Sequence, residues 1–160
     1  GTRIELNDGR ALSALSLHAK GDDPLPPLGM EANDPSLTGF TLAHALRARR
    51  GPIKPALMDQ KVLAGLGNIY AAEALWRAKI SPRAAASSVS RARLDKLAQA
   101  IHQVLEEENR PPGRYTDAEG RDRFHVYDRE GQSCTRCASN IKRIPQAGRS
   151  TYFCPKCQRW

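Results

Sequence analysis

The sequence has few aromatic residues and lacks any long apolar run. Aromatic side chains make up 6% of its 160 residues, a proportion that disfavours a large β-sandwich. No apolar run approaches the roughly 20 residues that a membrane-spanning helix needs, and the opening residues do not form a basic and then apolar leader. We therefore expect a soluble, monomeric, cytoplasmic protein that does not contact a membrane.

Acidic residues are absent from residues 131–160. This stretch contains six basic residues, namely Arg136, Lys142, Arg143, Arg149, Lys156 and Arg159. Residues 110–160 hold 11 Lys and Arg against 5 Asp and Glu, so +6 of the net charge of +8 lies at this end of the chain. A run of charge is commonly no more than a solvated surface, but a block of one sign favours a polyanionic partner such as nucleic acid.

All four cysteines fall near the carboxyl end, in two Cys-x2-Cys pairs. Cys134 and Cys137 form the first pair, and Cys154 and Cys157 form the second, with 16 residues between the pairs. Each pair can occupy a tight turn, and two such turns can complete a tetrahedron of thiolates around one Zn²⁺. Four protein ligands leave no position for substrate, so the ion should be structural. Two disulfides are the alternative, which a reducing compartment disfavours.

Proline and glycine clusters at 22–27 and 110–113 divide the chain into three stretches. Residues 3–17 alternate apolar and charged side chains around a turn at Asp8-Gly9, which predicts a β-hairpin. Because a lone hairpin is marginal in water, we expect it either to be the trailing edge of a larger sheet or to pack on the helices. The middle stretch predicts four helices, over about 38–50, 55–63, 68–80 and 90–108, with Thr38 or Thr41 as the cap of the first.

These patterns predict a mainly α fold with a small β zinc finger. We expect a remnant hairpin and linker over residues 1–27, a helical bundle over 28–122 and a zinc-bound hairpin over 123–160.

The segment Gly65-Leu66-Gly67-Asn68 joins two of the predicted helices. Its two glycines allow a sharp turn and the close approach of a ligand, and the helix start that follows offers N–H groups with partial positive charge. Lys54 can add a point charge on the same face. The plain alternative is a helix end followed by a turn, with Asn68 as an ordinary N-cap. We expect Glu73 to hold the backbone of this turn in place.

Two separate motifs give the sequence a resemblance to a known family. The first runs from Lys54-Pro55 through Gly65-Leu66-Gly67-Asn68 to Ile80-Ser81-Pro82. The second comprises Phe124-His125-Val126-Tyr127, the two cysteine pairs and Arg149-Ser150-Thr151-Tyr152-Phe153. Together they resemble the helix-two-turn-helix module and the zinc finger of the formamidopyrimidine-DNA glycosylase and endonuclease VIII family, over about residues 28–160.

The resemblance implies base-excision repair of oxidised bases in double-stranded DNA. A damaged base must leave the duplex before it can react, and a grip on the neighbouring phosphates can hold the bent DNA. In the family, the residues that match Asn68 and Arg149 grip these phosphates, and Lys54 lies near the lesion. The candidate DNA-binding residues are Asn68, Arg149, Lys54, Gly67, Lys142 and Arg143. The segment 110–123 is short for a loop that folds over a flipped purine, which favours the endonuclease VIII branch of the family.

The sequence departs from the family at the catalytic end. Family members use an amino-terminal proline as the nucleophile and a neighbouring glutamate for proton transfer, whereas this chain begins Gly1-Thr2 and its first proline is Pro24. We therefore expect no catalytic residue here and no activity of the chain alone. It is either the carboxy-terminal part of a glycosylase with AP lyase activity or a degenerate family member.

Two other classes of protein remain open. A zinc ribbon of a transcription or ribosome-associated factor shares the cysteines and the basic charge, but it does not need the Gly-x-Gly-Asn turn. A zinc module for protein interaction favours apolar anchors over a block of cations.

Overall fold

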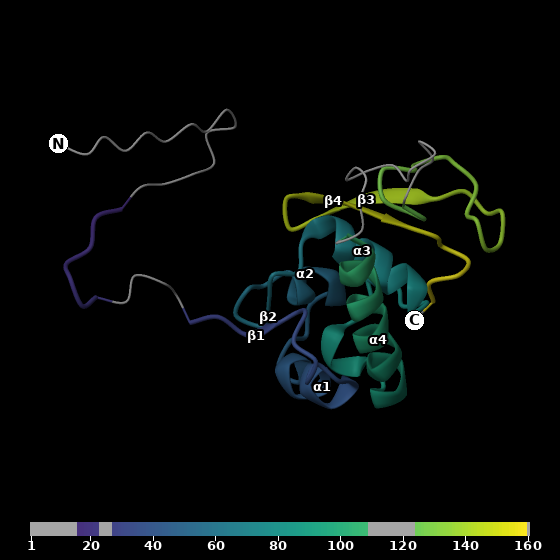
Figure 1. Cartoon of the computed structure of the whole chain (residues 1–160). Coiled ribbons are helices and arrows are strands. Elements are labelled where there is room, and N and C mark those ends of the chain that lie inside the picture. Colours follow the sequence, from purple (N-terminus) through teal and green to yellow (C-terminus); the bar gives the residue numbers. More distant parts are fainter. Residues whose placement is uncertain (1–15, 23–26, 109–123, 160) are drawn as a thin grey trace.

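A computed structural model describes residues 16–22, 27–108 and 124–159, and it places a helical bundle beneath a two-stranded hairpin (Figure 1). The helices in this part of the chain are α1 (Gly39–Leu46), α2 (Ile53–Leu57), α3 (Asn68–Arg77) and α4 (Arg91–Glu108), with a 3₁₀ turn at Ala86–Ser88. The strands are β1 (Met30–Glu31), β2 (Leu63–Ala64), β3 (Lys142–Gln146) and β4 (Arg149–Phe153). The predicted fold class, mainly α with a small β unit, is confirmed.

Two sequence predictions fall largely or wholly outside the described residues. The hairpin expected over residues 3–17 has only residues 16 and 17 within them, and the segment 110–123 lies outside them. Within the described part, no helix has both the length and the apolar character needed to cross a bilayer.

The bundle rests on the packing of α1 against α4. Thr38 is the cap of α1, because its hydroxyl accepts the Thr41 N–H at 3.3 Å while the Thr41 hydroxyl accepts the Thr38 N–H at 2.9 Å. The helix ends at Leu46 rather than near Arg50. Gly39 faces α4 so closely that a Cβ atom there would collide with the backbone nitrogen of Asp95. A side chain at this position would push the two helices apart.

The prediction that the second helix continues to Leu63 is wrong. α2 ends at Leu57, and the chain then turns, with the Val62 N–H bonded to the Asp59 carbonyl at 2.7 Å. The Asp59 carboxylate accepts the Lys61 N–H at 3.0 Å, a local bond that competes with the helical pattern. Leu63 instead pairs with Met30 in the parallel β1–β2 contact.

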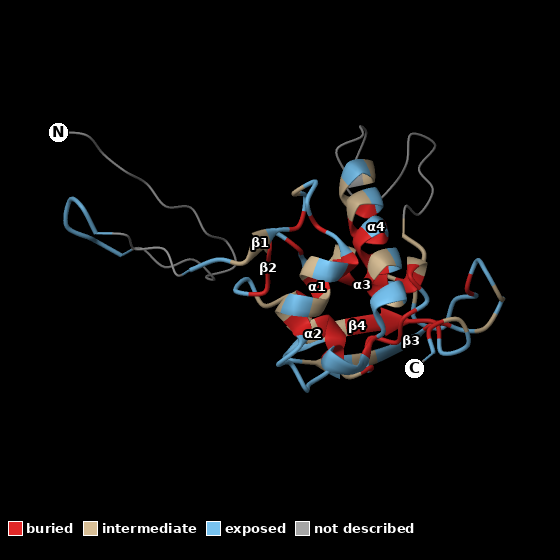
Figure 2. Cartoon of the chain, turned by 90° about the horizontal axis from the view of Figure 1, so that it is seen from below, coloured by how far each residue is buried: buried red, intermediate tan, exposed pale blue. Residues whose placement is uncertain are grey.

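Helix α3 belongs to both halves of the molecule. Its start at Asn68 is as predicted, and its Ala71, Ala74 and Leu75 enter the core of the bundle. On another face, Ala72 and Trp76 join a second core with Val126, Ile141, Tyr152, Cys134 and Cys154. Figure 2 shows the buried stretches running along α3, α4 and β4. The β3–β4 hairpin is thus packed directly on the helical bundle.

Candidate nucleic-acid interface

The four cysteines form one cluster. Their Sγ atoms all lie within 4.8 Å of one another, and a tetrahedron with 2.3 Å Zn–S bonds needs sulfur separations of about 3.8 Å. The Sγ atoms of Cys137 and Cys154 lie 3.4 Å apart, far beyond the S–S bond length of about 2.05 Å. All four are free cysteines, so the disulfide alternative is wrong and the donor set fits one structural zinc.

The electrostatics of the cluster also fit a divalent cation. Burial, followed by the neighbouring Cys137 and Cys154 sulfurs, raises the pKa of Cys157 to about 12. Hydrogen bonds from Ser139 lower the pKa of Cys137 to about 6. Thiols crowded around one point resist ionising together, and a bound Zn²⁺ stabilises the thiolates that such crowding disfavours.

The zinc module, residues 124–159, contacts the bundle through side chains that stack on Trp76. The Arg136 guanidinium carbon lies 3.8 Å from the Trp76 ring centroid, and Arg136 Nη1 donates to the Trp76 carbonyl at 3.0 Å. The His125 ring stacks on Trp76 at 4.2 Å. A cation and an aromatic ring held against one indole fix the first cysteine turn against α3.

Glu73 supplies a second connection, and the prediction that it holds the Gly67-Asn68 turn is wrong. Its carboxylate accepts the backbone N–H groups of His125, Val126 and Tyr127 at 2.9–3.0 Å. The side chain is 2% exposed. A carboxylate with three N–H donors orders the segment that leads into the zinc module.

Four of the six candidate DNA-binding residues line one depression of about 250 Å³. Lys54 comes from α2, Gly67 and Asn68 come from the start of α3, and Arg149 comes from the first residue of β4. Asp59, which also lines it, pairs with Arg49 at 3.1 Å. The β-turn beside Arg149 places Ala147 and Gly148 at φ +47° and +72°, as a tight hairpin requires. Residues from three distant parts of the sequence thus meet at one point.

Lys54 and Asn68 connect α2 and α3 to β4. Lys54 Nζ donates to Asn68 Oδ1 at 2.5 Å and to Thr151 Oγ1 at 2.8 Å. Asn68 Nδ2 donates to the Ser150 carbonyl at 3.2 Å. Burial, and then the charge of Arg149, lower the pKa of Lys54 to about 8. Arg149 itself is exposed.

Lys142 and Arg143 do not line this depression. Side chains alternate between the two faces of a strand, and the register pairs Gln146 with Arg149 and Arg143 with Tyr152. Arg143 therefore lies on the opposite face of the hairpin from Arg149, and its Nη1 atom approaches Glu130 at 3.8 Å. Lys142 shares the face of Arg149 but sits at the other end of the ribbon.

The two glycines of the turn differ in conformation. Gly65 has φ +80°, a left-handed value that favours glycine. Gly67 is the N-cap of α3 with φ −86° and ψ 172°, and a Cβ atom there would meet nothing in the described chain closer than Tyr70 at 3.9 Å. The fold therefore needs glycine at 65 but not at 67.

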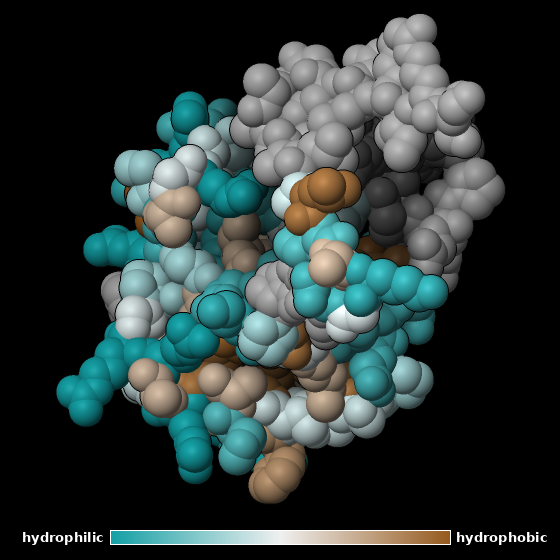
Figure 3. Space-filling model, turned by 90° about the vertical axis from the view of Figure 1, so that its left-hand side faces the viewer, coloured by the Kyte–Doolittle hydropathy of each residue, from teal (hydrophilic) through white to brown (hydrophobic). Residues whose placement is uncertain are grey.

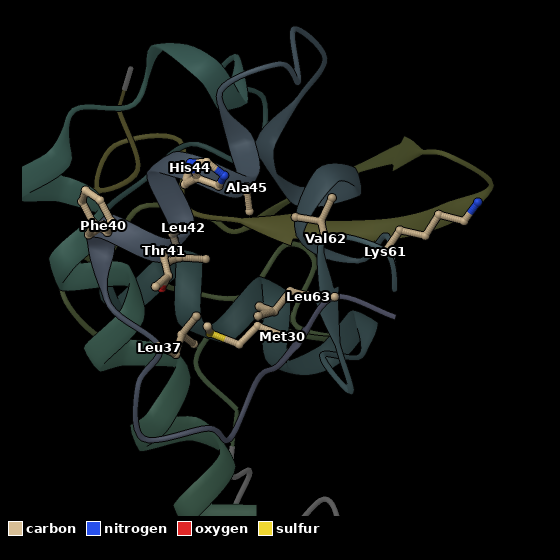
Figure 4. Close-up of a pocket in the computed structure, with 11 residues that line it drawn as sticks. Met30, Leu37, Phe40, Thr41, Leu42, His44, Ala45, Lys61, Val62 and Leu63 are labelled. Atoms are coloured by element: carbon tan, nitrogen blue, oxygen red, sulfur yellow. The ribbon is translucent and has the colours of Figure 1, made fainter. Parts of the chain in front are cut away.

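A second hollow, of about 450 Å³, is apolar. It lies between α1 and the β1–β2 pair and is lined largely by Met30, Leu37, Phe40, Leu42, Val62 and Leu63, while Lys61 extends away from it (Figure 4). Figure 3 shows the side of the molecule that lies at the left in Figure 1. This face is mostly hydrophilic, with hydrophobic atoms visible in its hollows. An apolar lining is unsuited to a phosphate.

Comparison with known proteins gives matches to both motifs. The model of the formamidopyrimidine-DNA glycosylase H2TH domain matches residues 28–111, and that of the zinc finger found in FPG and IleRS matches residues 131–159. Formamidopyrimidine-DNA glycosylases of Chelativorans sp. (strain BNC1) and Gluconobacter oxydans (strain 621H) are 41% and 42% identical over 98% and 99% of this chain. The chain spans 60% and 63% of those two relatives.

Solved structures of proteins with the same family name have a similar fold. MutM (FPG) from Thermus thermophilus superposes with a TM-score of 0.70 at 35% identity, covering 82% of this chain and 53% of that one. Lactococcus lactis Fpg in a complex with DNA containing an abasic site gives 0.72 at 31% identity, covering 83% of this chain and 52% of that one.

The bundle and its cysteine cluster define a helix-two-turn-helix protein with a carboxy-terminal zinc finger. With these matches, the chain belongs to the formamidopyrimidine-DNA glycosylase family. The zinc finger holds one structural zinc.

Sequence reasoning missed Thr151 and Trp76. Thr151 lies two residues after Arg149 on β4, so strand alternation alone places it on the same face. Trp76 lies four residues after Ala72 on α3, a spacing that puts both on one helix face. The sequence does not show that this face meets the zinc module.

Proposed function

We propose that this chain is the DNA-binding part of a base-excision-repair glycosylase that acts on oxidised bases. Asn68 and Arg149 grip the backbone phosphates beside a flipped nucleotide in double-stranded DNA, and Gly67 leaves room for the backbone to approach. Lys142 and Arg143, which lie outside the depression, add only to the general attraction for DNA. The protein acts as a monomer in the cytoplasm.

The observation that carries this proposal is the shared depression. An amide at a helix start and an exposed guanidinium on a rigid hairpin face the same space, and N–H groups at helix starts and guanidinium groups are preferred phosphate ligands. The Lactococcus lactis relative of similar fold was solved with damaged DNA, which supports the same partner for this chain.

The proposed contribution of these 160 residues is the grip on DNA and not the bond-breaking step. The family nucleophile, an amino-terminal proline, has no counterpart in this sequence. We therefore propose that the chain binds damaged DNA but neither releases the base nor cuts the strand. Incubation with a duplex carrying one abasic site should give no strand cleavage and no adduct after borohydride reduction; either product would contradict this part of the proposal.

Binding is tested by the fluorescence anisotropy of a short labelled duplex with one central abasic site. Losing a charged hydrogen bond to phosphate should weaken affinity about tenfold or more, so R149A and N68A should each show such a loss. R149A should also lower the slope of log affinity against log salt by about 0.9, whereas N68A, which removes no charge, should not.

Matched substitutions outside the depression serve as controls. Arg47 directly follows α1, is exposed and does not line the depression, and Asn33 is exposed in the turn before α1. R47A and N33A should leave affinity within about twofold of the parent chain. Equal losses in R47A and R149A would show attraction by net charge alone.

A further inference from the structure

Lys54 is enclosed by the protein although it lines the depression. It is 1% exposed, and its Nζ atom faces three oxygens: Asn68 Oδ1 at 2.5 Å, Thr151 Oγ1 at 2.8 Å and the Ser150 carbonyl at 3.5 Å. An ammonium group has three N–H bonds. These three acceptors therefore occupy all of its donors, the last of them weakly.

The contacts of Asn68 fix which way its amide points. An ammonium can only donate, so the atom facing Lys54 must be Oδ1, and a carbonyl can only accept, so the atom facing Ser150 must be Nδ2. Turning the amide over would set donor against donor and oxygen against oxygen. The contacts among the described residues use one of the two N–H bonds on Nδ2.

The orientation of this amide decides how an anion is received. With Oδ1 held by Lys54, the remaining N–H of Asn68 is available for a phosphate oxygen. With the amide turned over, the carbonyl oxygen would face the phosphate and repel it. A cation bonded to Oδ1 also polarises the amide, which strengthens the N–H as a donor.

We propose that Lys54 is a positioning residue: anchored by Thr151, its ammonium holds the Asn68 amide in the orientation that presents an N–H to a DNA phosphate, and Lys54 does not bind the phosphate itself. This inference rests on the proposed function. It replaces the expectation that Lys54 adds a point charge directly to the DNA, and it gives Thr151, which is fully buried, a part in binding DNA.

The test is a double-mutant cycle between Lys54 and Asn68, measured with the abasic duplex and the full chain. K54M keeps an unbranched stem of similar length and removes the charge. It should weaken binding about tenfold, as N68A does, and the K54M/N68A double variant should bind no more weakly than N68A. The salt slope of K54M should stay that of the parent chain. Multiplied losses in the double variant, or a slope lowered by about 0.9 as for R149A, would overturn the inference.

A second variant keeps the test valid should K54M fail to fold. T151V removes the hydroxyl that anchors Lys54, and residue 151 is too buried to touch DNA. It should weaken binding about fivefold, and that loss should vanish in the N68A background. An unchanged affinity in T151V, or an equal loss with and without Asn68, would overturn the inference. K96M, at an exposed lysine on α4, measures the effect of losing one unit of charge.

Failure of this inference differs from failure of the proposed function. If N68A and R149A both bind like the parent chain, the clamp itself is wrong. If both weaken binding while K54M acts independently of Asn68, the clamp stands and only the positioning role of Lys54 is refuted.

Discussion

Two charged side chains, Lys54 and Glu73, are buried in the described part of the molecule. Neither has a counter-ion as its main partner; each is instead held by several neutral hydrogen-bonding groups. Both side chains bond across from the helical bundle to the zinc module, Lys54 to Thr151 on β4 and Glu73 to residues 125–127. Because a buried charge without such partners is strongly destabilising, each one specifies where the module sits.

The affinity of the chain for DNA should depend on pH through the charge of Lys54. Burial and the charge of Arg149 lower its pKa to about 8 in the free protein. Because only the ammonium form holds the Asn68 amide in the orientation proposed to bind phosphate, bound DNA favours the charged form and so raises that pKa in the complex. The gain in affinity is therefore complete below about pH 8 and lost as pH rises through the value in the complex.

The measurement is the dissociation constant for the abasic duplex from neutral to alkaline pH. The parent chain should lose affinity above about pH 8, and K54M should lack this step. The same alkaline loss in both proteins would assign the titration to another group.

The turn before α3 contains one glycine that the backbone conformation requires and one that it does not. Gly65 has a left-handed backbone and Gly67 does not, so we predict that G65A lowers the free energy of unfolding by about 1 kcal/mol. G67A should leave stability nearly unchanged but weaken DNA binding, because its methyl group faces the space proposed for the DNA backbone.

Urea unfolding and anisotropy on the two variants check this pair of outcomes. A G67A chain that binds DNA as well as the parent would mean that the backbone of the duplex stays clear of the turn.

The segment entering the zinc module depends on Glu73 in the same way. We predict that E73Q, which exchanges one carboxylate oxygen for an amide nitrogen, leaves a backbone N–H unpaired and lowers the free energy of unfolding by about 1–3 kcal/mol. Thermal unfolding measures this effect. E106Q, at an exposed glutamate on α4, should change stability by less than about 0.5 kcal/mol, and equal shifts in both variants would count against the role of Glu73.

The two hydrophobic cores of the molecule should depend differently on zinc. The larger core draws only on buried residues between Ala32 and Val104, whereas the smaller one contains Cys134 and Cys154. We predict that a chelator leaves most of the helical circular dichroism in place but alters the fluorescence of Trp76 and abolishes DNA binding, because Arg149 loses its fixed position. Added Zn²⁺ should restore both. DNA binding that survives chelation would mean that the zinc does not position the clamp.

Local patterns were enough to predict several parts of this molecule. The Cys-x2-Cys spacing identified the four zinc ligands, the threonines at the start of α1 included its cap, and the turn at 65–68 identified the start of α3. Each of these depends on residues close together in the sequence. The family resemblance then predicted that Asn68 and Arg149 act on the same stretch of DNA. These two residues are far apart in the sequence: Asn68 bonds Ser150, the residue after Arg149, across a sequence separation of 82.

The features that sequence reasoning got wrong depend largely on long-range contacts. The end of α2 was misplaced because the chain turns at Asp59 and Leu63 then pairs with Met30. Glu73 was misassigned because its partners lie 52 to 54 residues further on. The burial of Lys54 follows from β4 packing over α2 and α3, which no local pattern of charge reveals.

Neutralising single phosphates of the duplex tests whether Asn68 and Arg149 grip them. A duplex in which a methylphosphonate replaces one phosphate beside the abasic site should bind the parent chain about tenfold more weakly than the unmodified duplex. R149A or N68A, whichever has lost the contact to that phosphate, should bind the two duplexes equally well. If every flanking methylphosphonate weakens the binding of the parent chain and of both variants by the same factor, Asn68 and Arg149 do not grip those phosphates.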